Sequence, residues 1–110
     1  MSRDQAYLLD IANACQTILE LTQDMDQAEF LADKRTHLAT LYELTVIGEV
    51  VKRLSSEFRE SNPETPWKQI AGMRDKLIHD YNQVDLALIW EVVKSNIPQL
   101  LALIVMDYRD

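Results

Sequence analysis

The amino-acid sequence predicts an all-α protein, an up-and-down bundle of about four to five helices, with one domain over residues 1–110. The chain holds only two Gly and three Pro, too few for a turn-rich β protein. Apolar residues recur every three to four positions over long segments, which is the period of one helix face. A domain of this size buries a small core, so packing against a second copy would add stability.

The first predicted helix covers residues 4–22, with Ser2 or Asp4 as its N-cap. Its apolar stripe includes Cys15, which indicates a buried packing residue rather than a reactive thiol. A polar connector follows, and residues 28–31 add a short helical turn.

A long helical pattern then runs over residues 33–58. An inner stripe follows it: Leu38, Leu41, Thr45, Gly48, Val51 (or Lys52) and Leu54. A second apolar edge consists of Leu44, Ile47 and Val50. A helix apolar over so much of its girth needs two packing partners, which we expect to be the chain's own core and a second subunit. Gly48 costs a helix about 1 kcal/mol relative to Ala, so it indicates close approach of another helix; a tolerated defect is the alternative.

Pro63 and Pro66 mark the clearest break in the chain. Thr65 as N-cap, with Pro66 in the first helical position, predicts a helix that runs to about residue 81. Asp85 is expected to cap a fourth helix over residues 86–95. Pro98 predicts a separate or kinked fifth helix over residues 97–106.

Composition indicates a soluble cytoplasmic protein. A single Cys excludes an intrachain disulfide, the first residues lack the apolar run of a signal peptide, and the longest apolar run, 100–106, is too short to cross a bilayer. The net charge is −7, of which residues 1–33 hold one Arg against seven Asp and Glu. Residues 34–110 hold ten Lys and Arg against eleven Asp and Glu, so we expect an anionic ligand to meet that part, without tight non-specific binding to nucleic acid.

The third helix is expected to carry the functional side chains. Its core stripe consists of Ile70, Met73 and Leu77. Arg74 and Tyr81 fall at the edge of that stripe, whereas His79 and Asp75 fall on the opposite side. Asp75 lies four residues before His79, so its carboxylate is placed to hold one ring nitrogen and favour the protonated imidazole.

Arg74 and His79 suit RNA cleavage without a metal. That reaction needs a group to take the 2′-hydroxyl proton, a group to protonate the leaving 5′-oxygen, and positive charge beside the phosphorane. Histidine suits proton transfer and arginine suits phosphate. One helix does not bring the two into register, but fraying near His79 or a two-fold axis beside the helix would; a dimer would offer two of each. The structural alternatives are a solvated His79, an Arg74 paired with a neighbouring carboxylate, and a Tyr81 at the core edge.

The spacing Arg74-x-x-x-x-His79-x-Tyr81 resembles the R-x-x-x-x-H-x-Y signature of the HepT toxins, a branch of the HEPN superfamily. The likeness covers nearly the whole chain. It extends to residues 46–54, 63–67, 70–74, 84–85 and 90–93.

The resemblance implies a homodimer with a metal-independent ribonuclease site in the dimer cleft, no cofactor, and a role as the toxin of a type VII-like toxin–antitoxin system. It implies Arg74 and His79 as catalytic residues, Asp75 as a supporting polar residue and Tyr81 as the site of AMP transfer. The implied partner is an antitoxin of the minimal nucleotidyltransferase type, and an AMP group beside Arg74 would block the cleft.

Other candidates are weaker. His37 is expected on a solvated face, and Asp33 with His37 resembles half of a metal site without further ligands. Trp67 and Trp90 are expected to be packing anchors rather than platforms for bases. The main functional alternative is a non-catalytic helical adaptor that binds substrate for a nucleotidyltransferase. The third is a homodimeric helical module without a ligand.

Overall fold

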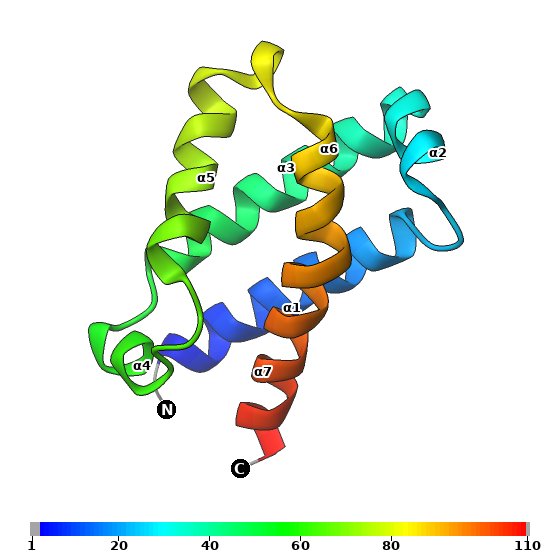
Figure 1. Cartoon of the computed structure of the whole chain (residues 1–110). Coiled ribbons are helices and arrows are strands. Elements are labelled where there is room, and N and C mark those ends of the chain that lie inside the picture. The colour runs from blue at the N-terminus through cyan, green and yellow to red at the C-terminus, as the bar shows by residue number, and fades with distance from the viewer. Residues whose placement is uncertain (1–2, 110) are drawn as a thin grey trace.

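The computed structural model describes residues 3–109, apart from the side chains of Tyr81, Tyr108 and Arg109. The described chain is mostly helical, with short turns between the helices, and contains no strand, which confirms the predicted all-α class (Figure 1). Three long helices carry most of the fold: α1 (Arg3–Leu21), α3 (Lys34–Val51) and α5 (Trp67–His79). Shorter elements join them: α2 (Gln27–Ala32), α4 (Ser56–Ser61) and the 3-10 turn η1 (Tyr81–Gln83).

The last long element is one C-terminal helix made of three parts: α6 (Leu86–Glu91), the π-helical turn η2 (Val92–Asn96) and α7 (Ile97–Arg109). Asp85 caps it by accepting hydrogen bonds from the N–H groups of Ala87 and Leu88, as predicted. As predicted, a separate α-helical stretch begins at Ile97, because the π-helical turn interrupts the α-helix just before Pro98, although the chain stays helical through it. Pro98 has no N–H to donate and its ring crowds the preceding turn; the wider turn, in which Ile97 N–H bonds to Val92 O, lets the helix continue.

Because α6, η2 and α7 form one continuous helix, its whole length, and not only the apolar run 100–106, has to be compared with the thickness of a bilayer. By length and composition, the 22 residues Leu86–Asp107 would suffice to cross a bilayer, since an 18-residue window within them has a mean hydropathy of 1.4. The core helix of a globular protein passes the same test, and the inner face of this one packs in the core through Ile89, Val93, Ile97 and Leu100. The apolar run 100–106, from which the sequence analysis argued against a membrane span, is therefore shorter than the helix that meets the length and composition test.

The core forms around α3, which packs against α1 and α5, while α1 also packs against α7 (Figure 1). Both partners of α3 thus belong to the same chain, so its apolar girth does not itself require a second subunit. The buried side of α3 holds Leu44, Ile47 and Val50, which were predicted as the second edge. Leu38, predicted on the inner stripe, is 44% exposed, so that assignment was wrong.

The single helix predicted over residues 33–58 is two helices in the structure. The first, α3, ends at Val51, and α4 follows with Ser55 as its N-cap. Ser55 caps α4 with its hydroxyl, and its N–H and Oγ also bond to the Asp4 carboxylate at 2.9 and 2.6 Å. Asp4 therefore ties α1 to α4 from inside the first turn of α1. The alternative cap, Ser2, lies outside the described residues.

The start of α5 differs from the prediction by one residue. Pro66 is the N-cap, with a non-helical ψ of 70°, and no side chain caps the helix, so Thr65 is not the cap. Trp67 fixes this end instead: it is buried, its Nε1–H donates to Asn62 O at 3.0 Å, and its ring contacts Phe58 edge to face. Packing of the indole thus replaces the missing cap.

Gly48 is the point at which α3 and α5 approach most closely. A Cβ placed there would lie 2.3 Å from Arg74 Cβ and 3.2 Å from Ile70 O. The predicted close approach is therefore confirmed, and the neighbouring helix is the one that carries Arg74.

Replacing Gly48 by Ala tests this contact. The new methyl group must push the base of Arg74 away, so we expect the free energy of unfolding to fall by about 1–3 kcal/mol despite the better helix propensity of Ala. Gly72→Ala is the matched control, because Gly72 is exposed in α5 with nothing within 4 Å of an added Cβ. That variant should gain up to about 1 kcal/mol. Urea denaturation measures both, and equal gains would refute the close contact.

Candidate functional site

Arg74 lies at the edge of the core, as predicted. Its helix turns Leu77 into the core, with Ile70 and Met73 partly buried beside it. The Arg74 side chain is 27% exposed, with its Cβ against Gly48 and its guanidinium at the surface between α3 and α5. The glycine contact therefore sets where the guanidinium emerges.

Five charged side chains form a continuous network on this surface, which we call the charge network: Glu49, Lys52, Arg53, Arg74 and Asp75. Arg74 Nε lies 2.9 Å from Glu49 Oε2, and Arg74 NH1 donates to Asp75 Oδ1 at 2.9 Å. Lys52 Nζ donates to the same Asp75 oxygen at 2.6 Å. Arg53 NH2 lies 3.7 Å from Glu49 Oε1.

The guanidinium of Arg74 contacts two carboxylates, but these contacts do not use all of its N–H donors. Its Nε–H does not point at the Glu49 oxygen, so this contact is an ion pair without a hydrogen bond. The hydrogen bond that Arg74 donates to Asp75, reinforced by the charge of Glu49, raises the pKa of Arg74, so the group stays charged. Among the side chains that the structure describes, none accepts a hydrogen bond from its NH2 group, which leaves donors for an anionic ligand.

Asp75 has different partners from those predicted. The prediction joined it to His79, but its Oδ1 accepts from Lys52 and Arg74. The hydrogen bond from Lys52, followed by that from Arg74, lowers the pKa of the Asp75 carboxyl. Two cations from the α3–α5 contact outcompete a histidine one helical turn away. Asp75 thus links α3 to α5.

Lys52 and Glu49 were not singled out from the sequence. The available signal was Gly48: once it marked a helix contact, its neighbours Glu49 and Lys52 had to lie beside that contact. The sequence did not say which helix α3 meets there, so the pairing with Arg74 and Asp75 needed the structure.

His79 is the last residue of α5 and is exposed, as predicted. It lies about 7.5 Å along the helix axis and about 140° around it from Arg74. One chain therefore does not bring the imidazole and the guanidinium together. Tyr81 begins η1, so the α-helix ends two residues earlier than predicted, and the Tyr81 side chain is outside the described part.

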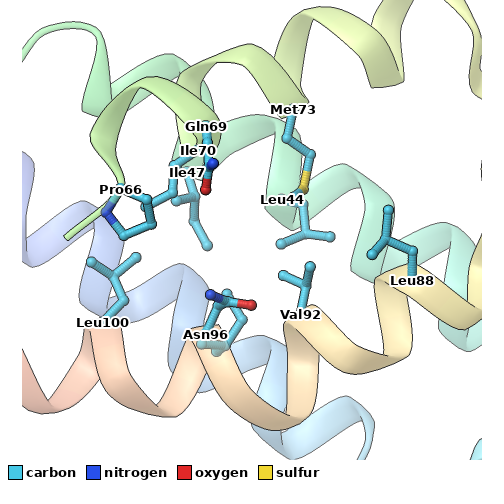
Figure 2. Close-up of a pocket in the computed structure, with 11 residues that line it drawn as sticks. Leu44, Ile47, Pro66, Gln69, Ile70, Met73, Leu88, Val92, Asn96 and Leu100 are labelled. Atoms are coloured by element: carbon cyan, nitrogen blue, oxygen red, sulfur yellow. The ribbon is translucent and has the colours of Figure 1, made fainter. Parts of the chain in front are cut away.

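A separate cavity of about 250 Å³ lies between α5 and the C-terminal helix (Figure 2). Ile70 and Met73 face it from α5, and Leu88, Val92 and Leu100 face it from the other side. Its polar lining side chains are Gln69 and Asn96, neither of which titrates. It lies on the core side of α5, away from Arg74, and offers no acid or base.

Two of the other candidates play structural roles. Trp67 and Trp90 are buried packing residues, which confirms the prediction for both. Cys15 is also buried, which raises the pKa of its thiol to about 12.

The prediction for His37 was wrong. His37 is half-buried with its ring 6.1 Å from that of Phe30, and its Nδ1 is buried without a hydrogen-bond partner, so it is not a solvated surface residue. Asp33 caps α3 by accepting from Thr36 N–H. Among the described residues, no three His, Cys, Asp or Glu gather to hold a metal ion.

The carboxylate of Asp75 makes the α3–α5 contact sensitive to acid. Its pKa is lowered on folding, so its stabilising contribution is present above the usual value of 3.8 and is lost as the pH falls through the lower folded value. We expect wild type to be more stable than Asp75→Asn at pH 7, with the difference shrinking below about pH 4. Urea denaturation across pH measures it, with Asp10→Asn, an exposed carboxylate on α1, as control. A difference independent of pH would contradict the pairing.

Comparison with known proteins adds a family to this geometry. A family model described as "Ribonuclease HepT-like" matches residues 11–106. The chain is 45% identical over 94 residues to the "Probable ribonuclease HepT" of Thermococcus cleftensis, with 86% of each chain covered. It is 44% identical over 96 residues to a "Putative RNase" of Methanocaldococcus jannaschii, covering 87% of this chain and 83% of the relative.

The chain is 41% identical over 100 residues to another "Putative RNase", from Caldanaerobacter subterraneus, covering 91% of this chain and 89% of the relative. No solved structure matches the chain. The family match covers most of the chain and includes Arg74, His79 and Tyr81. The chain therefore belongs to the ribonuclease HepT-like family.

Proposed function

We propose that this protein is a metal-independent ribonuclease whose site forms in a cleft between two copies of the chain. The observation that carries the proposal is the placement of Arg74, whose guanidinium is fixed by Glu49 and Asp75 and keeps donors toward solvent. The names of the relatives, which describe ribonucleases, support the same activity.

In this proposal the two functional groups divide the chemistry. His79 exchanges protons with the 2′-hydroxyl or the leaving 5′-oxygen, and the second histidine of the dimer takes the other role. The 2′-oxygen attacks phosphorus and the bond to the 5′-oxygen breaks. Arg74 stabilises the negative charge that builds on the phosphate oxygens between these events.

The exposed apolar residues support a dimer through the face that carries the charge network. On α3, Leu38 and Tyr42 are 44% and 68% exposed, and they share a stripe of the helix with Glu49. On α5, Ile78 is 47% exposed and lies between Arg74 and Asp75 around the helix. A two-fold axis beside these residues would cover them and place the end of α5 of one subunit near Arg74 of the other.

The proposed regulation acts on Tyr81. A minimal nucleotidyltransferase antitoxin transfers AMP from ATP: the tyrosine oxygen attacks the α-phosphorus and pyrophosphate leaves. The bound nucleotide, next to Arg74 and His79, then excludes RNA from the cleft by bulk and charge. The protein would thus be the toxin of a type VII-like toxin–antitoxin pair in the cytoplasm.

One observation favours the second candidate function, a non-catalytic adaptor for a nucleotidyltransferase. Arg74 already pairs with two carboxylates within its own chain, as a docking or structural arginine does. Cleavage by the isolated protein separates the two functions.

We expect purified wild-type protein to cleave RNA equally well with and without EDTA. Arg74→Ala and His79→Ala should each lower the rate by a factor on the order of 10²–10⁴, because each removes a group that acts in the transition state. His37→Ala is the matched control, since His37 is the other histidine of the chain and belongs to a different contact. It should keep the wild-type rate.

Two results would reject this mechanism. Loss of cleavage in EDTA would exclude the metal-free chemistry, and equal rates for all variants would exclude this site. Absence of cleavage by wild type, together with binding to the nucleotidyltransferase, would favour the adaptor.

Co-expression with a minimal nucleotidyltransferase antitoxin should add the mass of one or more AMP units to the protein. The adduct should be absent from Tyr81→Phe and present on Tyr42→Phe, a control at a strongly exposed tyrosine of α3. Intact-mass spectrometry measures it. An adduct that persists on Tyr81→Phe would place the modification elsewhere.

A further inference from the structure

We infer that Lys52 is a second phosphate-binding residue, and that Lys52 and Arg74 together form a clamp for one phosphate of the RNA backbone. The inference rests on the proposed ribonuclease function for the identity of the ligand. Lys52 lies outside the R-x-x-x-x-H-x-Y spacing, at the C-cap of α3 rather than on α5.

The clamp follows from a shared carboxylate oxygen. Asp75 Oδ1 accepts from Lys52 Nζ at 2.6 Å and from Arg74 NH1 at 2.9 Å, so the two nitrogens are at most about 5.5 Å apart, the sum of these distances. Two cations repel each other at such a separation unless an anion lies between them. Asp75 thus holds the Lys52 ammonium group and the Arg74 guanidinium side by side on one surface of the protein.

Both cations keep donors for a ligand. An ammonium group has three N–H donors, and the contact with Asp75 uses one of those of Lys52. Arg74 keeps its NH2 group, which has no hydrogen-bond partner in the described part of the structure. A phosphodiester presents two non-bridging oxygens, so the ammonium group would take one oxygen and the planar guanidinium the other.

Stability alone does not account for the network. Its ion pairs lie at the surface, where Lys52 is 38% and Asp75 49% exposed, and such pairs contribute little to folding. Three cations against two carboxylates leave the network with a charge of +1 in a chain of net charge −7. This local excess of positive charge lies where an anionic backbone would meet the proposed site.

The test measures binding separately from cleavage. The probe is a short RNA of mixed sequence with 2′-O-methyl riboses, which cannot be cleaved by attack of a 2′-hydroxyl, and affinity is followed by fluorescence anisotropy over a salt series. We expect Lys52→Met to weaken binding about tenfold at low salt, because a charge-assisted contact is lost. The slope of log affinity against log salt should fall by about one. Lys52→Arg, which keeps the charge, should restore most of the affinity.

Lys34→Met is the matched control, since Lys34 is an exposed lysine at the other end of α3, about 27 Å along the helix. It should leave affinity and slope unchanged. Thermal unfolding of each variant shows whether the fold is kept.

The outcomes distinguish the clamp from the proposed function. If folded Lys52→Met binds like wild type with the same salt slope, the clamp is refuted, whether or not the protein cleaves RNA. If Lys52→Met loses affinity and slope while wild type cleaves no RNA, the phosphate site stands and the proposed ribonuclease function fails.

Discussion

The contact between Gly48 and Arg74 determines the rest of the candidate site. An added Cβ at position 48 would lie 2.3 Å from Arg74 Cβ, so α3 and α5 meet at a distance that only glycine permits. That distance brings Glu49 and Lys52 of α3 within ion-pair reach of Arg74 and Asp75 of α5. A wider separation would break the pairs that Lys52 and Glu49 make across the contact, and Arg74 would be held only by Asp75 of its own helix.

The structure divides α5 into two functional sides. The inner side packs Leu77 into the core and faces an apolar cavity through Ile70 and Met73. The outer side carries the charge network and ends at the exposed His79. Since Arg74 and His79 point about 140° apart on one helix, a second chain is the simplest way to complete a site that needs both. The exposed Ile78 lies on this outer side of α5, and Tyr42 is exposed on the neighbouring helix α3.

The sequence predicted what local periodicity and single residues determine. Helix class, the buried stripe of α5, the outward His79 and the close approach at Gly48 all followed from spacing and from the cost of glycine in a helix. The residues of the signature also led to the family. Tertiary contacts determined what was missed. Asp75 accepts from Arg74 of its own helix and, across the helix contact, from Lys52 at the C-cap of α3, rather than pairing with His79. At Pro98 the sequence predicted the start of a separate helix at Ile97, but not the π-helical turn that keeps the chain helical through this point.

The central claim is that two chains must meet for the site to work. The most direct measurement combines molecular mass and RNA cleavage in the same chromatographic fraction for Tyr42→Asp, a charge placed on the proposed dimer face. Leu9→Asp, an equally simple change at an exposed residue of α1, serves as the control. The account predicts that Tyr42→Asp is a folded monomer that does not cleave RNA, whereas Leu9→Asp stays dimeric and active. A monomeric Tyr42→Asp that cleaves at the wild-type rate would contradict it.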